Sequence, residues 1–558
     1  MRKMRNLVSR GSTGCIEDPD TEVREGSPRT VADLLSGIIS RYEVFFLVLF
    51  LLVFAFLTYA ESNEKPLWYD EIFTIIVAGQ PTWHAMAQAM PGDGNPPLYA
   101  LLTRVLIGIF GQSALVIRLP SAIGLLAALV GLFVFIRREC GVIFGLLAVA
   151  IVCLEPVSKY AYEARPYGLL LGFMMLGLVS WQSATRAADS ARPRRLALMG
   201  MVLAIVGSIL SHNIGVVEIG IPLLFGEATR IWRTRRTDWP VLATAASAIP
   251  ALVVTAPMMH RTSTLLLNYS RISLHPLTWQ KFMLLWVHRP LQTLPLVLGA
   301  HVGANLVWFL VSLIALGWAP RFLNRQLNQA MPATALAPIQ SEISPHIIAA
   351  ALGATLLIPI TWVLMMSENG WYFARYGVGS VAGIAILACL FLRRTNLGGS
   401  AVPLALLTVL ATQFSHPAVD YLRHLPARAT PHFSVYTDSS GLPIVIADPL
   451  TFLPAWWYAP QSIKTRLVYL KDVDFAKDYD WAIPEVALTS EEPLISANFA
   501  DYDSFVATQD HFILSIPAGW IPAGWRDGET ERLEAAGFRL TAIRDVPGDE
   551  IYDVQRVH

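Results

Sequence analysis

Long apolar runs follow one another along most of this chain. A bilayer core of about 30 Å takes about 20 apolar residues per helix, and runs of roughly this length, separated by short polar stretches, fill residues 42–414. The pattern predicts about eleven membrane spans. They lie near 42–60, 114–136, 140–157, 167–183, 196–211, 214–229, 240–259, 292–318, 346–366, 372–392 and 399–414.

The stretch 96–138 allows either one span or two, and the arginines decide between these alternatives. Basic residues gather on the cytoplasmic side of membrane proteins. The arginine pairs and clusters at the helix ends share one side only if 96–111 is a surface helix rather than a span. With that choice, both Asp70 and everything after residue 414 lie outside the cytoplasm.

The two ends of the chain have a different pattern. Residues 1–41 are polar and predict a largely disordered cytoplasmic leader ahead of a first span that acts as a signal anchor. Residues 415–558 alternate short apolar runs (LPIVIAD, TRLVYL, HFILSI) with the helical stretch GETERLEAAGF. This alternation predicts a small extracytoplasmic α/β domain. The predicted fold is therefore an all-α polytopic membrane domain (42–414), with surface helices in its first external loop (61–113), followed by that α/β domain.

Composition agrees with this fold and narrows the class of function. Of the 558 residues, 54% are hydrophobic and only 15% charged, with 42 basic and 42 acidic residues; the mean hydropathy is +0.48. A zero net charge argues against nucleic acid as a partner, and four scattered cysteines form no disulfide framework. The zero is a cancellation, because from residue 415 on acidic residues outnumber basic ones about two to one, which supports an exported tail.

Two adjacent carboxylates are the first candidates for chemistry. Asp70 and Glu71 stand in LWYDEIFTIIVAG, at the predicted start of a surface helix just beyond the first span. A carboxylate here can serve as a general base, and its neighbour can bind an acceptor or a metal. The alternative is the ordinary preference of helix N-termini for acidic residues. A divalent metal stays open as a cofactor.

Other polar residues fall on the same predicted face as Asp70. Arg165 in YEARPYG and Arg375 in FARYG offer planar guanidinium groups that match a phosphate. The alternative for each is snorkelling to the interface, or pairing, as Glu163 with Arg165 could do. The further candidates for substrate contact are Tyr162, Glu163, Asn95, His212 and Tyr376.

An external loop at 260–290 breaks the rule for basic residues. The loop could bind an anionic lipid headgroup or a glycan phosphate. The alternative is an interfacial amphipathic helix that rests on anionic lipid. Its basic residues are His260, Arg261, Arg271, His275, Lys281, His288 and Arg289.

Several of these motifs occur in a familiar order. LWYDEIFTIIVAG, NPPLY with RLPSAIG, YEARPYGLLL and FARYGVG resemble the C-type glycosyltransferases that use polyprenyl-phosphate sugars. The similarity is to their family-39-like bacterial branch, with the lipid A aminoarabinose and lipopolysaccharide galacturonic acid transferases, and to the protein O-mannosyltransferases. It covers roughly 42–395. A departure is Gly94-Asn95, where the aminoarabinose transferases carry Glu-Lys and many relatives a His. The acceptor or phosphate contact of that basic side chain is therefore not expected here, and the resemblance does not identify the sugar.

The resemblance implies an inner-membrane glycosyltransferase with a cytoplasmic N-terminus. It would move a sugar, with inversion, from a polyprenyl-phosphate donor to a hydroxyl of a lipid, glycan or protein acceptor on the periplasmic side. Asp70 would be the catalytic base and Glu71 its partner, with Arg165 and Arg375 near the donor phosphate. A lipid-linked glycan flippase or transporter is the alternative, and a non-catalytic scaffold with an exported binding domain is a third interpretation.

Overall fold

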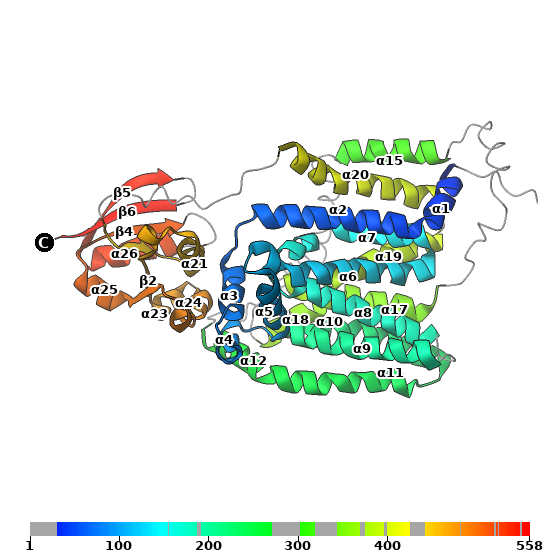
Figure 1. The fold of residues 1–558 in the computed structure, drawn as a ribbon, viewed down its shortest axis with the longest axis horizontal. Helices are drawn as coiled ribbons and strands as arrows, with labels where there is room; N and C mark the ends of the chain where they lie inside the picture. The colour runs from blue at the N-terminus through cyan, green and yellow to red at the C-terminus, as the bar shows by residue number, and fades with distance from the viewer. Residues whose placement is uncertain are drawn as a thin grey trace, which may run out of the picture.

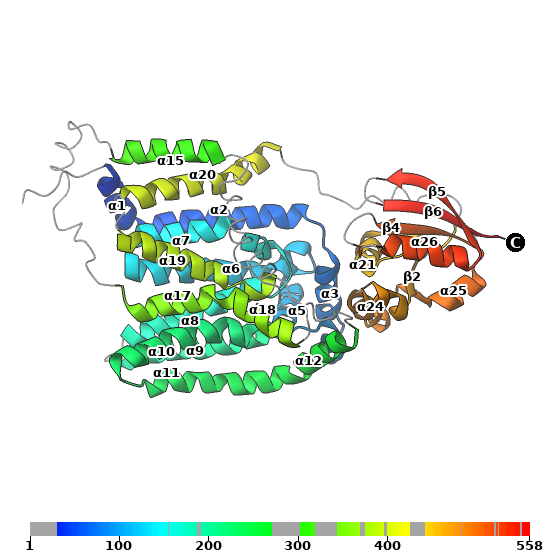
Figure 2. The same ribbon diagram turned by 180° about the vertical axis from the view of Figure 1, so that it is seen from behind.

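The computed structural model describes residues 31–154, 156–186, 191–269, 302–317, 343–368, 374–395, 399–424, 441–479, 481–517, 521–522, 524–546 and 549–557. Within these ranges a bundle of roughly parallel helices lies beside a separate sheet domain that contains the C-terminus (Figure 1). The reverse view shows the same arrangement, with α1 (Val31–Arg41) at the end of the bundle farthest from the sheet (Figure 2).

The helices of the bundle follow the predicted apolar runs. They are α2 (Glu43–Glu64), α6 (Ala114–Cys140), α7 (Val142–Leu154), α8 (Tyr167–Arg186), α9 (Ala191–Ser211), α10 (Gly215–Thr234), α11 (Trp239–Ala243), η2 (Thr244–Ser247), α12 (Ala248–Tyr269), α15 (Val302–Gly317), α17 (Pro345–Thr355), α18 (Leu357–Glu368), α19 (Ser380–Thr395) and α20 (Ala401–His424). The described residues contain six helices long and apolar enough to cross a membrane, or seven if the bent pair α17–α18 is one span. The membrane character is confirmed, and the number eleven stays a prediction.

The leader differs in part from the prediction. Residues 1–30 lie outside the described part of the chain, but residues 31–41 form helix α1 instead of continuing a disordered leader. Val31, Leu35 and Ile39 stand on one face of α1 and pack with α15 and α20, and Ala32 is buried among them. This apolar face supplies the burial that orders the helix.

Ion pairs gather the helix-end arginines at one end of the bundle. Arg137 on α6 binds Glu43 on α2 at 2.6 Å, Arg186 on α8 binds Glu139 on α6, and Arg194 on α9 pairs with Asp238, which caps α11. These contacts join successive helix ends, as expected if their arginines share a side.

Three short helices close the opposite end, next to the sheet domain (Figure 1). They are α3 (Tyr69–Ala78), α4 (Trp83–Asp93) and α5 (Leu98–Phe110). Helix α5 lies across the bundle end (Figure 1), and its place at the membrane surface stays a prediction. Arg104 on α5 donates to the carbonyl oxygen of Ala78 at 3.0 Å, which ties α5 to the end of α3.

Helices α6 and α8 approach so closely that their backbones touch. A Cβ at Gly172 would lie 2.5 Å from the carbonyl oxygen of Gly124, and a Cβ at Gly168 would lie 2.3 Å from that of Ser121. Small residues permit such approach in membrane bundles. This packing sets the position of Arg165, which lies just before α8.

The C-terminal residues form one six-stranded sheet in the order β3-β2-β1-β4-β6-β5. β1 (Ile444–Ile446), β2 (Leu467–Lys471), β3 (Asn498–Asp501) and β4 (His511–Pro517) are parallel, and β5 (Phe538–Val546) and β6 (Asp549–Arg556) form an antiparallel edge. The helices are α21 (Pro449–Tyr458), α22 (Gln461–Lys464), α23 (Val473–Asp478), α24 (Ala482–Thr489), α25 (Tyr502–Thr508) and α26 (Trp525–Ala535). The runs LPIVIAD, TRLVYL and HFILSI overlap β1, β2 and β4, so the predicted α/β tail is confirmed.

The glycine contact between α6 and α8 can be tested by thermal unfolding in detergent. Replacing Gly172 by alanine pushes a methyl group into the backbone of α6, and we expect a loss of roughly 1–3 kcal/mol. Gly220→Ala on α10 is the matched control, because nothing lies within 4 Å of its added Cβ. It should be neutral or stabilise by up to about 1 kcal/mol. Equal effects of the two variants would contradict the close packing.

Candidate functional site

The adjacent carboxylates of α3 have opposite surroundings. Successive residues of a helix project about 100° apart, so Asp70 and Glu71 cannot share one face. The Asp70 side chain is 19% exposed, whereas that of Glu71 is 0% exposed. Every residue of α3 other than Asp70 is buried. The helix therefore presents one carboxylate outward and draws the other into the protein.

Glu71 is bound on both oxygens by Arg118 of α6. Arg118 donates through Nε to Oε1 and through Nη2 to Oε2, each at 2.7 Å. The backbone N–H of Ala164 also donates to Oε1 at 2.8 Å. The sequence analysis proposed that Glu71 binds an acceptor or a metal. In the structure these contacts already occupy both oxygens of its carboxylate. Its geometry is that of a residue that positions α3.

Arg118 itself is a residue that sequence reasoning missed. Its side chain is 1% exposed, and beyond Glu71 it donates to the carbonyl oxygens of Ser62 at 2.8 Å and Lys65 at 3.1 Å. It joins α2, α3 and α6 at one point. The signal that could have found it is its place in IRLPS, an arginine inside an apolar run.

Arg165 reaches the exposed carboxylate. Its Nη2 lies 3.2 Å from Oδ2 of Asp70, and its backbone carbonyl accepts from the Ser121 hydroxyl at 2.8 Å. Glu163 does not form the pair with Arg165 that the sequence allowed, because it binds Nζ of Lys65 at 2.8 Å. The same Nζ lies 5.7 Å from the centre of the Tyr162 ring, and burial, with Glu61 and Glu163 nearby, raises the pKa of Tyr162 to about 12.

Arg375, His212 and Tyr376 meet around Tyr167. The guanidinium carbon of Arg375, in η5 (Ala374–Gly377), lies 5.8 Å from the centre of the Tyr167 ring. His212, just after α9, has its ring 5.2 Å from Tyr167 and 5.8 Å from Tyr376. Burial, reinforced by the positive charges of Arg165 and Arg375, lowers the pKa of His212 to about 3. The imidazole is therefore neutral, and both arginines act on the same small region.

A glutamate on α10 fixes the segment that follows Arg375. Oε2 of Glu218 accepts from the backbone N–H of Gly379 at 3.0 Å, and Glu218 is fully buried. The glycine leaves room for this contact, since a Cβ at position 379 would lie 2.4 Å from the same oxygen. Nothing local in the sequence joins Glu218 to FARYGVG, so pattern reasoning missed it.

Asn95 lies in a turn fastened to the same end of the bundle. The preceding Gly94 has a positive φ of 67°, and its carbonyl oxygen accepts from Asn213 at 3.0 Å and from Thr262 at 3.1 Å. Asn213 follows His212 directly. The turn that carries Asn95 is therefore attached beside the histidine.

The described residues bear only in part on two predictions, the basic loop at 260–290 and a bound metal. In the basic loop, His260 and Arg261 are exposed on α12, and Arg271, His275, Lys281, His288 and Arg289 lie outside the described residues. Within the described part of the chain there is no group of three or more histidine, cysteine or acidic residues that could hold a metal ion.

Comparison with known proteins gives one family match. The model of a family described as dolichyl-phosphate-mannose-protein mannosyltransferase matches residues 94–260. This segment contains NPPLY, IRLPS and YEARPYG, and with them Arg118, Arg165 and His212. No curated protein matches the chain.

Three solved structures are similar over most of the chain. ArnT from Cupriavidus metallidurans bound to undecaprenyl phosphate is 15% identical, with 92% of this chain and 98% of that one covered at a TM-score of 0.48. Its apo state gives 14% identity, coverage of 91% and 98% and a TM-score of 0.49. An Archaeoglobus fulgidus oligosaccharyltransferase complex with Zn and sulfate gives 11% identity, coverage of 91% and 72% and a TM-score of 0.37.

The matched segment confirms the resemblance that the order of the motifs predicts. Residues 94–260 are accordingly similar to a family of membrane glycosyltransferases that use a polyprenyl-phosphate sugar.

Proposed function

We propose that this enzyme transfers a sugar, with inversion, to a hydroxyl acceptor on the periplasmic face of the inner membrane, with Asp70 as general base. One observation carries the proposal: Asp70, the one partly exposed carboxylate of α3, lies 3.2 Å from Arg165, at the place where Arg375 and His212 converge. Donor and acceptor would meet at the bundle end that the sheet domain covers. The acceptor is a lipid, glycan or protein.

The reaction needs a base and positively charged groups that bind the leaving phosphate. As the acceptor oxygen bonds to the anomeric carbon, its proton passes to Asp70, and the bond from that carbon to the phosphate oxygen breaks on the opposite side. Negative charge grows on the departing polyprenyl phosphate. Preplaced guanidinium groups stabilise this charge more than they stabilise the bound donor, which lowers the barrier.

Arg165 is suited to link the two halves of the reaction. A guanidinium carries five N–H donors in a planar fork, so it can hold a carboxylate along one edge and face a phosphate along another. The contact with Asp70 orients that carboxylate. Arg375 approaches the same region from η5 and adds a second positive charge.

Replacing Asp70 by asparagine removes the base and preserves the shape of the side chain. We expect kcat to fall by roughly 10²–10⁴-fold, with folding and membrane insertion unchanged. The measurement is the release of free polyprenyl phosphate from a panel of polyprenyl-phosphate sugars in proteoliposomes. Asp503→Asn, an exposed aspartate of α25, is the matched control. Turnover near the wild-type rate in Asp70→Asn would remove Asp70 from the proposed role.

Arg375→Ala tests the proposed contact with the donor phosphate. Loss of a charge-assisted hydrogen bond costs about 1.5–3 kcal/mol, so kcat/KM for the donor should fall by roughly 10- to 100-fold, while KM for the acceptor changes little. Arg236→Ala, after the far end of α10, should alter neither value. Equal losses for donor and acceptor would argue against a phosphate contact.

The Glu71–Arg118 pair can be tested by separating stability from activity. Arg118→Met leaves Glu71 buried without its partner, and we expect a loss of about 3–5 kcal/mol of stability. The double variant Glu71→Leu with Arg118→Met removes both charges and should recover most of the unfolding temperature. Its activity should stay low, because the hydrogen bonds that hold α3 are gone. A double variant as unstable as the single one would show that the uncompensated charge is not the cause.

A further inference from the structure

The outer side of α3 is covered by the C-terminal domain. Tyr69, Ile72 and Ile76 of α3 belong to the same buried apolar cluster as Phe452 and Trp456 of α21. This cluster continues into the sheet through Ile444, Leu467 and Ile513. The helix that carries the proposed base is thus buried between the membrane bundle and the exported domain.

Two hydrogen bonds cross this boundary immediately beside Asp70. The backbone N–H of Leu67 donates to the hydroxyl of Tyr458 at 2.6 Å. The hydroxyl of Tyr69 donates to the carbonyl oxygen of Pro484, at the start of α24, at 3.3 Å. Burial, with the nearby Asp70 carboxylate as the next cause, raises the pKa of Tyr69, so this hydroxyl keeps its proton and remains a donor.

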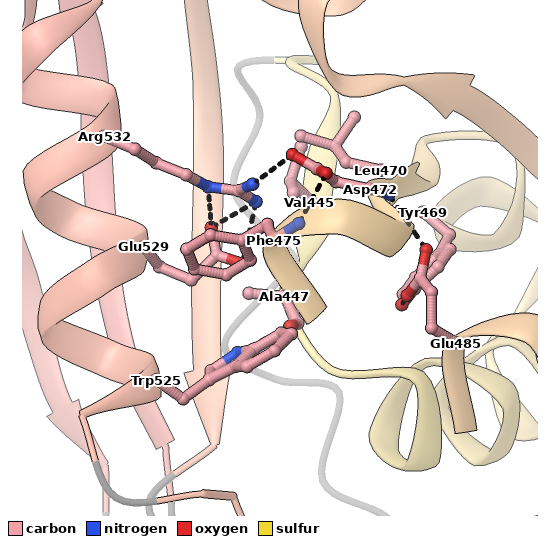
Figure 3. Close-up of a pocket in the computed structure, with 10 residues that line it drawn as sticks. All are labelled: Val445, Ala447, Tyr469, Leu470, Asp472, Phe475, Glu485, Trp525, Glu529 and Arg532. Carbon is pink, nitrogen blue, oxygen red and sulfur yellow. Dashed lines mark hydrogen bonds and ion pairs between the residues drawn. The ribbon is translucent and has the colours of Figure 1, made fainter. Parts of the chain in front are cut away.

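The residue after Pro484 belongs to a polar network within the domain, in which Glu485, Tyr469, Asp472 and Arg532 meet (Figure 3). Glu485, the next residue, accepts from the Tyr469 hydroxyl of β2 and from the backbone N–H of Asp472 at 2.9 Å. Asp472 in turn binds Arg532 of α26 at 2.8 Å. The start of α24 is therefore fixed to the end of β2 and, through Arg532, to α26.

The residues of this network also line the cleft drawn in Figure 3. The guanidinium carbon of Arg532 lies 3.8 Å from the centre of the Phe475 ring and 3.9 Å from that of Tyr502, and its Nη2 binds Glu529 at 2.7 Å. Burial raises the pKa of Glu485 and of Glu529 to about 7 each. Arg532 of α26 thus lies against Phe475 of α23 and binds Asp472 at the end of β2, and these contacts hold the three elements together (Figure 3).

We propose that the C-terminal domain is a positioning element for the base helix, acting through Tyr458 and through the contact of Tyr69 with Pro484. This inference rests on the proposed role of Asp70. The two contacts hold the backbone at residue 67 and the side chain at residue 69, on the approach to the carboxylate. A small shift there moves Asp70 away from the acceptor, and a displacement of about 1 Å can cost 10²-fold in rate.

The test uses the full-length enzyme with Tyr458→Phe, Tyr69→Phe and the double variant. Each substitution removes one hydroxyl and keeps the ring that packs in the apolar cluster. The double variant should lower kcat by roughly 10-fold or more, with KM for donor and acceptor changed less than about twofold. Tyr502→Phe is the matched control, since it removes a hydroxyl of the same domain and keeps the ring against Arg532; it should leave kcat unchanged.

Hydrogen exchange gives a second readout that does not depend on turnover. Backbone amides of residues 67–72 should exchange faster in the double variant by about 10-fold, and those of α6 and α8 should exchange as in the wild type. The control variant should match the wild type throughout.

The possible outcomes separate this inference from the proposed function. Wild-type kcat and unchanged exchange in the double variant would overturn the positioning role, even if Asp70→Asn is inactive. A rise in the acceptor KM alone would also overturn it and would indicate acceptor binding by the domain. Full activity of Asp70→Asn would instead contradict the proposed function.

Discussion

The buried ion pair between Glu71 and Arg118 is the constraint on which the site depends. Two charges removed from water are tolerated only when their partners satisfy them fully. Here both carboxylate oxygens accept from one guanidinium, and the remaining donors reach the carbonyls at the end of α2. The pair therefore fixes α2, α3 and α6 relative to one another. Because it commits Glu71 to the interior, Asp70, about 100° farther round the helix, faces Arg165 and stays partly exposed.

The two acidic residues of the motif thus differ in their surroundings rather than in the chemistry of their side chains. Asp70 meets solvent and Arg165, while Glu71 meets only buried donors. Neighbouring residues hold Glu71 and Arg165. The N–H of Ala164, directly before Arg165, donates to Glu71, and the hydroxyl of Ser121, on α6 with Arg118, donates to the carbonyl of Arg165. The proposed base and its neighbouring cation are consequently parts of one rigid unit.

The C-terminal domain completes this unit on the other side of α3. Its parallel strands place α21 and α24 against α3, and a core of apolar side chains runs without interruption from the membrane face into the sheet. A short surface helix would have little stability alone, because helices of this length are marginal in water. Burial on both sides gives α3 the fixed geometry that a general base needs.

Much of the fold was determined by the sequence alone. The apolar runs placed most helices of the bundle, the helix-end arginines marked one end, and the alternating tail predicted strands β1, β2 and β4. These signals are local, because lipid and the two secondary-structure periods impose their pattern on neighbouring residues. The sequence did not predict helix α1 at residues 31–41, because its apolar face is buried only by contact with α15 and α20.

The details of the site were decided by the tertiary structure. Glu71 meets Arg118 across 47 positions, Gly379 meets Glu218 across 161, and Leu67 meets Tyr458 across 391. Which acid is buried, and which arginine it meets, follows from how helices far apart in the chain pack. Sequence alone could name Asp70 and Glu71 as a pair, but only packing, which desolvates one and exposes the other, could give them different tasks.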